Sequence, residues 1–145
     1  MQHSDDQWER IEAIIGEDEG PTFADCVEKF HKHLVGSLEL PCDVTGIEDF
    51  RWEEFYVLGP GNQKEYERLK RDQPSYTDTY ELLAIEADVC SEWMMFYDED
   101  LAAHVRRKSD GNKFHLGLAE IEAVNKKSKN YQLLDDYSVW FVNSR

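Results

Sequence analysis

The chain has 145 residues, the length of one ordinary domain. Its apolar fraction of 41% and aromatic fraction of 12% suffice for a core without disulfides or a structural metal. Asp and Glu outnumber Lys and Arg by 31 to 16, giving a formal net charge of −15. This charge disfavours nucleic acid and anionic membranes as partners, and it favours cations and basic proteins.

The cysteines and the N-terminal composition indicate a compartment. Cys26, Cys42 and Cys90 are odd in number and far apart, which excludes a disulfide framework and disfavours a thiolate zinc site. The first ten residues are acidic where a signal peptide is basic, and no apolar run is long enough to span a membrane. We expect a cytoplasmic protein that acts as a monomer.

The N-terminal part of the chain predicts two helices. Ser4 begins a capping-box pattern, and Gly16 follows a run with one apolar face, so a first helix should end there. Thr22 predicts the N-cap of a second helix. The apolar face of that helix comprises Cys26, Val27, Phe30, Leu34 and Leu38.

The remaining chain predicts a sheet and a closing helix. Residues 1–40 should form a helical part that packs on a sheet-rich part, residues 41–145, in a single domain of residues 1–145. The closing helix should contain Leu133 to Phe141, with a strand through Val139 as the alternative. Strands are predicted at 42–45, 52–58, 81–90 and 121–124, and a short helix at 63–72.

A hairpin is predicted around the Asp-Gly pair at 110–111, which is typical of a two-residue turn. Counting outward from that pair places Arg107 opposite Phe114. The apolar residues of both strands then share one face. In this register His104 and His115 lie on the other face, toward solvent.

The most informative stretch is residues 46–59, GIEDFRWEEFYVLG. Four carboxylates lie within seven residues there, and large apolar side chains flank them. Burial of the apolar groups would hold the carboxylates close together, where they repel and where a bound cation would relieve the repulsion. Ca²⁺ takes six to eight oxygen ligands from such groups. We predict Asp49, Glu53, Glu54 and Asp78 as ligands, with Asp98, Glu99 and Asp100 as a second candidate group.

The pattern of an EF-hand is absent. Asp98 and Asp100 begin like one, but Leu101 and two alanines follow where polar ligands and a turn glycine belong. Catalysis is not expected, because Glu53 and Glu54 would point to opposite faces of a strand and no nucleophile motif is present. The alternative to a metal site is an acidic surface that binds a basic protein partner.

Several short motifs lie in the segment from residue 112 to the end: 113–118 (KFHLGL), 121–124 (IEAV), 126–128 (KKS) and 136–141 (DYSVWF), with one more upstream at 39–43 (ELPCD). In these motifs the chain resembles the calcium-binding protein family first recognised in cyanobacteria. It implies an α+β fold with a small curved antiparallel, SH3-like sheet, N-terminal helices and a C-terminal helix. It also implies Ca²⁺ bound by acidic loops outside the EF-hand class, for buffering or signalling in a bacterial cytosol without catalysis.

Overall fold

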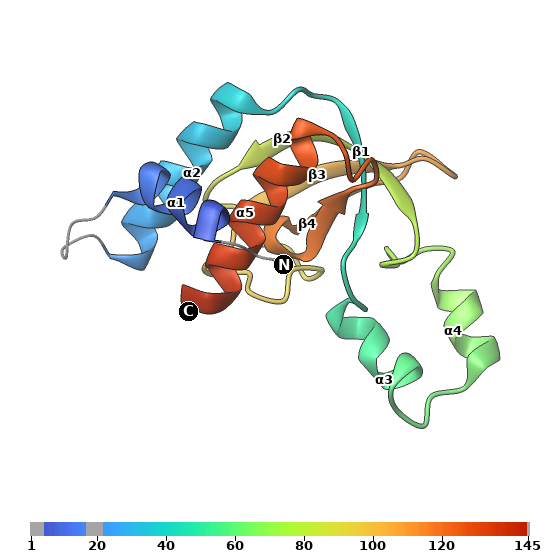
Figure 1. Ribbon diagram of the computed structural model, residues 1–145. Helices are drawn as coiled ribbons and strands as arrows, with labels where there is room; N and C mark the ends of the chain where they lie inside the picture. Colours follow the sequence, from blue (N-terminus) through green and yellow to red (C-terminus); the bar gives the residue numbers. More distant parts are fainter. Residues whose placement is uncertain (1–4, 17–21, 145) are drawn as a thin grey trace.

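A computed structural model describes residues 5–16 and 22–144 (Figure 1). The helices are α1 (Asp5–Ile15), α2 (Phe23–Ser37), α3 (Glu54–Val57), α4 (Gln63–Leu69) and α5 (Lys129–Ser144), with 3-10 turns η1 (Arg51–Glu53) and η2 (Leu118–Glu120). The strands are β1 (Cys42–Gly46), β2 (Thr79–Glu86), β3 (Ala102–Arg107), β4 (Lys113–Gly117) and β5 (Ile121–Ala123). No helix within these residues has the length and apolar character needed to cross a membrane.

The strands form one antiparallel sheet in the order β4-β3-β2-β1-β5. The sheet is open, with β4 and β5 at its edges. The predicted α+β class, with helices before and after an antiparallel sheet, is therefore confirmed. A register shift between Leu82 and Ala84 bends β2 against β3.

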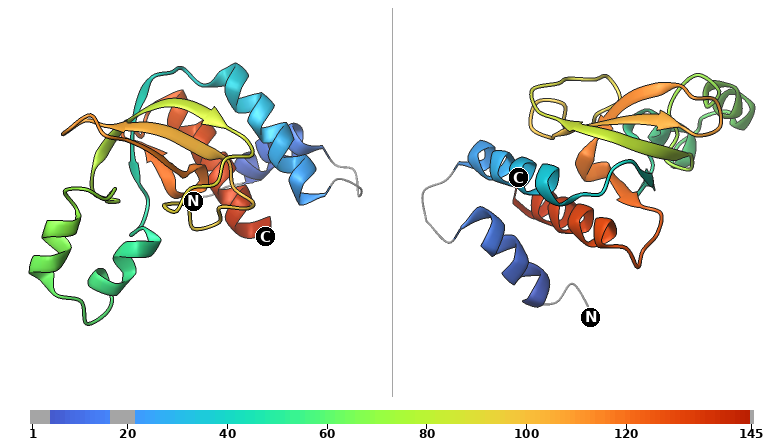
Figure 2. Two further views of the ribbon diagram at one scale, coloured as in Figure 1. Left: turned by 180° about the vertical axis from the view of Figure 1, so that it is seen from behind. Right: turned by 90° about the horizontal axis from the view of Figure 1, so that it is seen from above.

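Helices α1, α2 and α5 gather on the same side of the sheet, where they enclose the core (Figure 2). Aromatic rings join α2 to α5: Phe23 stacks on Trp140 with centroids 5.0 Å apart, and Phe30 meets Tyr137 edge-on at 5.4 Å. The helical assignment of 133–141 is confirmed, because a helix buries Leu134, Tyr137 and Phe141 on one face. A strand there is excluded.

Local capping signals set the N-terminal helices. The Thr22 hydroxyl accepts from the Asp25 N–H at 3.1 Å, and the Asp25 carboxylate accepts from the Thr22 N–H, which completes a capping box. Gly16 ends α1 with φ +86°, in the left-handed region that glycine adopts without strain. The predicted cap at Ser4 lies outside the described residues.

The prediction of a strand at 52–58 is wrong. Residues 51–57 form η1 and α3, whose first turn is closed by the Glu53 N–H donating to the Phe50 carbonyl at 2.8 Å. The Glu53 carboxylate caps this turn by accepting from the Phe50 N–H, and it is held in place by donors from more distant residues. We call η1, α3 and α4 together the arm, which projects from the sheet (Figure 1). Its helices meet through Tyr56 and Tyr66, whose rings stack at 5.4 Å, and Trp52 donates to the Pro74 carbonyl at 2.6 Å.

The predicted hairpin exists, but its register is wrong by two residues. Val105 lies opposite Phe114, and His104 lies directly opposite His115. The Arg107 N–H donates to the Asn112 carbonyl at 2.7 Å, so the loop is longer than the two-residue turn that the Asp-Gly pair predicts. A shift of two residues preserves which face each side chain occupies, so both histidines still lie away from the core.

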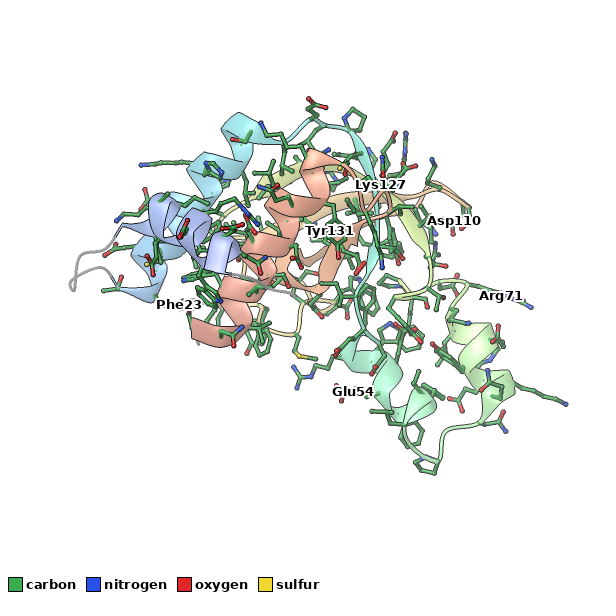
Figure 3. All side chains as sticks on the ribbon, in the orientation of Figure 1. Phe23, Glu54, Arg71, Asp110, Lys127 and Tyr131 are labelled. Atoms are coloured by element: carbon green, nitrogen blue, oxygen red, sulfur yellow. The ribbon has the colours of Figure 1, made fainter. Side chains whose placement is uncertain are left out.

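Arg107 attaches the arm to the hairpin. Its guanidinium donates to Asp110 at 2.8 and 3.1 Å, to Asp78 at 2.9 Å, and to three carbonyls at 70, 71 and 73. Figure 3 labels Asp110 at the hairpin tip and Arg71 at the end of the arm that faces it. Burial alone would lower the pKa of Arg107, but Asp110 and Asp78 outweigh burial and raise it, so the cation is permanent.

We predict that Arg107→Leu destabilises the protein by about 3 kcal/mol, because two carboxylates and three carbonyls lose a buried donor. The matched control is Arg106→Leu, which removes the neighbouring exposed pair with Glu81 and should cost less than about 1 kcal/mol. Urea unfolding followed by tryptophan fluorescence measures both. Equal losses in the two variants would contradict the structural role of Arg107.

Candidate metal centre

Glu53, a predicted ligand, is fully buried, with 0% of its surface exposed. Its Oε1 accepts from the N–H groups of Phe50 at 3.2 Å and Tyr76 at 2.9 Å. Its Oε2 accepts from the hydroxyls of Tyr66 at 2.6 Å and Ser75 at 2.7 Å. Four donors therefore compensate this carboxylate within the protein, and its geometry is that of a structural group that joins the arm to residues 75–76.

The other three predicted ligands are dispersed. Asp78 accepts from Arg107, so the cation beside it is a guanidinium. Glu54 is exposed on α3 (Figure 3), and Asp49 is partly exposed in the segment before η1. No three of Asp49, Glu53, Glu54 and Asp78 bring ligand atoms within 4.8 Å of one another. The structure does not gather this set into one site, and their role as ligands stays a prediction.

The second candidate group has a different environment. Asp98, Glu99 and Asp100 lie in the turns between β2 and β3, where Asp98 is exposed and Asp100 is buried. Asp100 Oδ1 accepts from the Tyr137 hydroxyl at 2.6 Å, and Oδ2 accepts from the Ala119 N–H at 3.0 Å. These contacts fix the Asp100 carboxylate against η2 and α5.

Glu120, on η2, brings a second carboxylate to Asp100. Its Oε2 accepts from the Met95 N–H at 3.1 Å. The two carboxylates meet above Gly117, where an added Cβ would overlap Glu120 Oε2 and lie only 2.7 Å from Asp100 Oδ2. Glycine at 117 thus leaves the space in which the two acids approach each other.

The proximity of these acids changes the ionisation of Glu120. Burial, and then the charge of Asp100, raise the pKa of Glu120 to about 7, although N–H donors from Met95 and Gly117 act in the opposite direction. Burial and Asp100 also raise the pKa of Tyr137, which keeps its hydroxyl as a donor. At neutral pH either a proton or a bound cation therefore stabilises the pair, because each relieves the repulsion between the two carboxylates.

One group of three close ligand atoms does occur within the described residues, and sequence analysis did not predict it. It consists of Glu86, His104 and His115, on three adjacent strands. The signal that could have found it is the hairpin register, because the two histidines lie opposite each other only when Arg107 pairs with Asn112 across a loop of four residues.

Two solved structures share this fold. One is the crystal structure of Anabaena CcbP, with a TM-score of 0.58 and 18% identity over 97% of this chain and 93% of that one. The other is named as a calcium binding protein in the calcium-binding form, with a TM-score of 0.57, 17% identity and the same coverage. This chain has their fold. No family model and no curated protein matches the chain.

The likeness confirms, for the fold, the resemblance that residues 112–145 indicated. It covers 97% of the chain. At 17–18% identity, the likeness shows the fold and does not identify binding residues in this chain.

We predict that Glu120 makes stability depend on pH. Its pKa is raised from 4.5 to about 7 on folding, so its favourable contribution is complete below pH 4.5 and is lost as pH rises through 7. In calcium-free buffer, the difference in free energy of unfolding between Glu120→Gln and wild type should shift in favour of the variant. The shift should be on the order of 1–3 kcal/mol as pH rises from about 4.5 to 8. Urea unfolding across this range measures the difference. A difference that stays constant with pH would contradict the account.

Proposed function

We propose that this protein binds Ca²⁺ outside the EF-hand class, at a site built on Asp100 and Glu120. The observation that carries this proposal is the approach of two partly or fully buried carboxylates across Gly117. The fold supports it, because a protein of the same fold is named as a calcium-binding protein. One ligand, Asp100, then comes from the second predicted group, and the other, Glu120, comes from η2.

The chemistry of the pair suits a hard cation. Ca²⁺ prefers carboxylate, carbonyl and water oxygens, and two carboxylates held together cost little further ordering when an ion binds. Asp98 and Glu99 belong to the same loop and add negative charge around it. Mg²⁺ should bind less well, because it demands a strict octahedron and gives up water reluctantly.

The cellular role that we propose is calcium buffering or signalling in a bacterial cytosol, by a monomer without catalytic activity. The resemblance to the cyanobacterial family supports this role. The acidic net charge of −15 is compatible with it, since a negative surface concentrates cations near the site.

Calorimetric titration of metal-stripped protein tests the site. Wild type should bind Ca²⁺, and its free energy of unfolding should rise by about 2.7 kcal/mol at 100-fold excess over Kd. Glu120→Gln should weaken Ca²⁺ binding at least tenfold. Gly117→Ala should weaken it too, because the added Cβ separates the carboxylates while every charge is retained.

The matched control is Asp49→Asn combined with Glu54→Gln, which removes two charges from the arm and the segment that precedes it. It should leave the affinity for Ca²⁺ within about twofold of wild type. If this double variant loses binding while Glu120→Gln retains it, the site lies on the arm, as the sequence alone indicated. Absence of any calorimetric or stability response at millimolar Ca²⁺ would refute calcium binding altogether.

A second candidate function is binding of a basic amphipathic segment. A hollow of about 1110 Å³ lies between α2 and the β2–β3 loop. Its lining combines apolar side chains with acids that outnumber the basic ones, and comprises among others Phe23, Val27, Val35, Val89, Tyr97, Glu28, Asp88, Asp98, Glu99, Asp100, His31 and Lys32. A hollow that offers both apolar and acidic side chains is complementary to a cationic amphipathic helix. This favours the alternative of a basic protein partner.

A cationic amphipathic peptide tests this second function by fluorescence anisotropy. We expect binding that weakens at least tenfold between about 50 and 500 mM salt, because salt screens the attraction between the acidic lining residues and the cationic peptide. Asp98→Asn with Glu99→Gln should weaken binding at low salt. The control, Glu67→Gln with Asp72→Asn, removes two charges from the arm instead and should have a smaller effect. Equal effects of both pairs would show non-specific attraction rather than a docking site.

A further inference from the structure

We propose that Glu86, His104 and His115 form a second metal site, which takes Zn²⁺ or a similar transition-metal ion rather than Ca²⁺. The site is independent of the proposed calcium function, because it uses different residues and a different ligand chemistry. Imidazole nitrogens suit Zn²⁺, Ni²⁺ and Cu²⁺, whereas Ca²⁺ takes oxygen ligands.

The sheet brings these three side chains together from adjacent strands. His104 on β3 lies directly opposite His115 on β4, and their rings stack with centroids 4.7 Å apart and planes inclined by 15°. Glu86 pairs with Ala102 on β3, two residues before His104, so its side chain reaches the histidines diagonally. Rigid pairing in three neighbouring strands holds the group without a loop.

Two of the three distances in the group match those of tetrahedral coordination. Glu86 Oε1 lies 3.5 Å from His104 Nδ1 and 3.4 Å from His115 Nε2. Ligand atoms that lie about 2.0–2.1 Å from a tetrahedral Zn²⁺ are about 3.3–3.4 Å from one another. All three ligand atoms lie within 4.8 Å of one another. The imidazole lone pairs lie in the ring planes, which are inclined by only 15°, so the partly exposed histidine side chains must rotate before both lone pairs point at one ion.

The group is also accessible. The side chains of Glu86, His104 and His115 are 38%, 28% and 33% exposed. An ion can therefore enter from solvent, and water can fill the fourth position. Two His and one Glu with an open position is a ligand set that Zn²⁺ adopts in proteins. The same distances also suit an ion pair between Glu86 and a protonated histidine. A measurement of metal affinity distinguishes a metal site from such an ion pair.

Calorimetric titration of tag-free protein with Zn²⁺ at about pH 7.5 tests the site. Wild type should bind Zn²⁺, and His104→Gln or His115→Gln should weaken that binding at least about tenfold. The matched control is His33→Gln, which changes a histidine on α2 outside the group and should bind as wild type does. These variants alter partly exposed side chains, and a thermal melt of each confirms that the fold is retained.

Two further measurements locate the ion. With Co²⁺ as the probe, the visible spectrum should lack a thiolate charge-transfer band, and Cys90→Ser, which removes an exposed thiol, should leave the spectrum unchanged. Glu120→Gln should retain Zn²⁺ binding, and millimolar Ca²⁺ should not displace the ion. The proposal is overturned if wild type does not bind Zn²⁺, if both histidine variants bind it as wild type does, or if Glu120→Gln or Cys90→Ser abolishes binding.

Discussion

Repulsion between carboxylates that the fold brings out of water is the constraint on which this structure depends. A chain with a net charge of −15 must either leave its acids in solvent or compensate each one that it buries. Glu53 is compensated by four hydrogen-bond donors. Asp78 and Asp110 are compensated by the buried Arg107. Asp100 and Glu120 also accept hydrogen bonds, but they are held against each other, which makes that pair responsive to a proton or a cation.

The first two arrangements explain the architecture of the arm. Glu53 joins η1 to Tyr66 on α4 and to the backbone at 76, while Arg107 joins carbonyls after α4 to the hairpin tip. The arm is thus connected to the sheet through charged and polar groups in addition to the packing of Trp52 against the core. Within the stretch with the highest density of acids, Glu53 therefore has a structural role, whereas the responsive pair lies beside α5.

Features set by nearby residues could be predicted from the sequence. Thr22 predicts the N-cap of α2, and Gly16 predicts the end of α1. The spacing of Leu134, Tyr137 and Phe141 predicts a buried helical face. The helical turn at 51–57 could not be predicted, because its aromatic composition is typical of strands. What decides its conformation is the set of donors from distant residues that surround Glu53.

The candidate sites were harder to predict for the same reason. Asp100 was included in the second candidate group, but its partner Glu120 is twenty residues away and carries no local signal of proximity. The space that joins them depends on Gly117, a role visible only when the three residues are seen together. Likewise, His104 and His115 meet only in the observed hairpin register, which the length of one loop decides.

A crystal structure of the protein grown with Ca²⁺ tests the central claim most directly, because anomalous scattering distinguishes Ca²⁺ from water. The account predicts an anomalous peak between the carboxylates of Asp100 and Glu120, with further oxygen ligands from the surrounding loop. A peak beside Asp49 and Glu54, with no peak at Asp100, would contradict it.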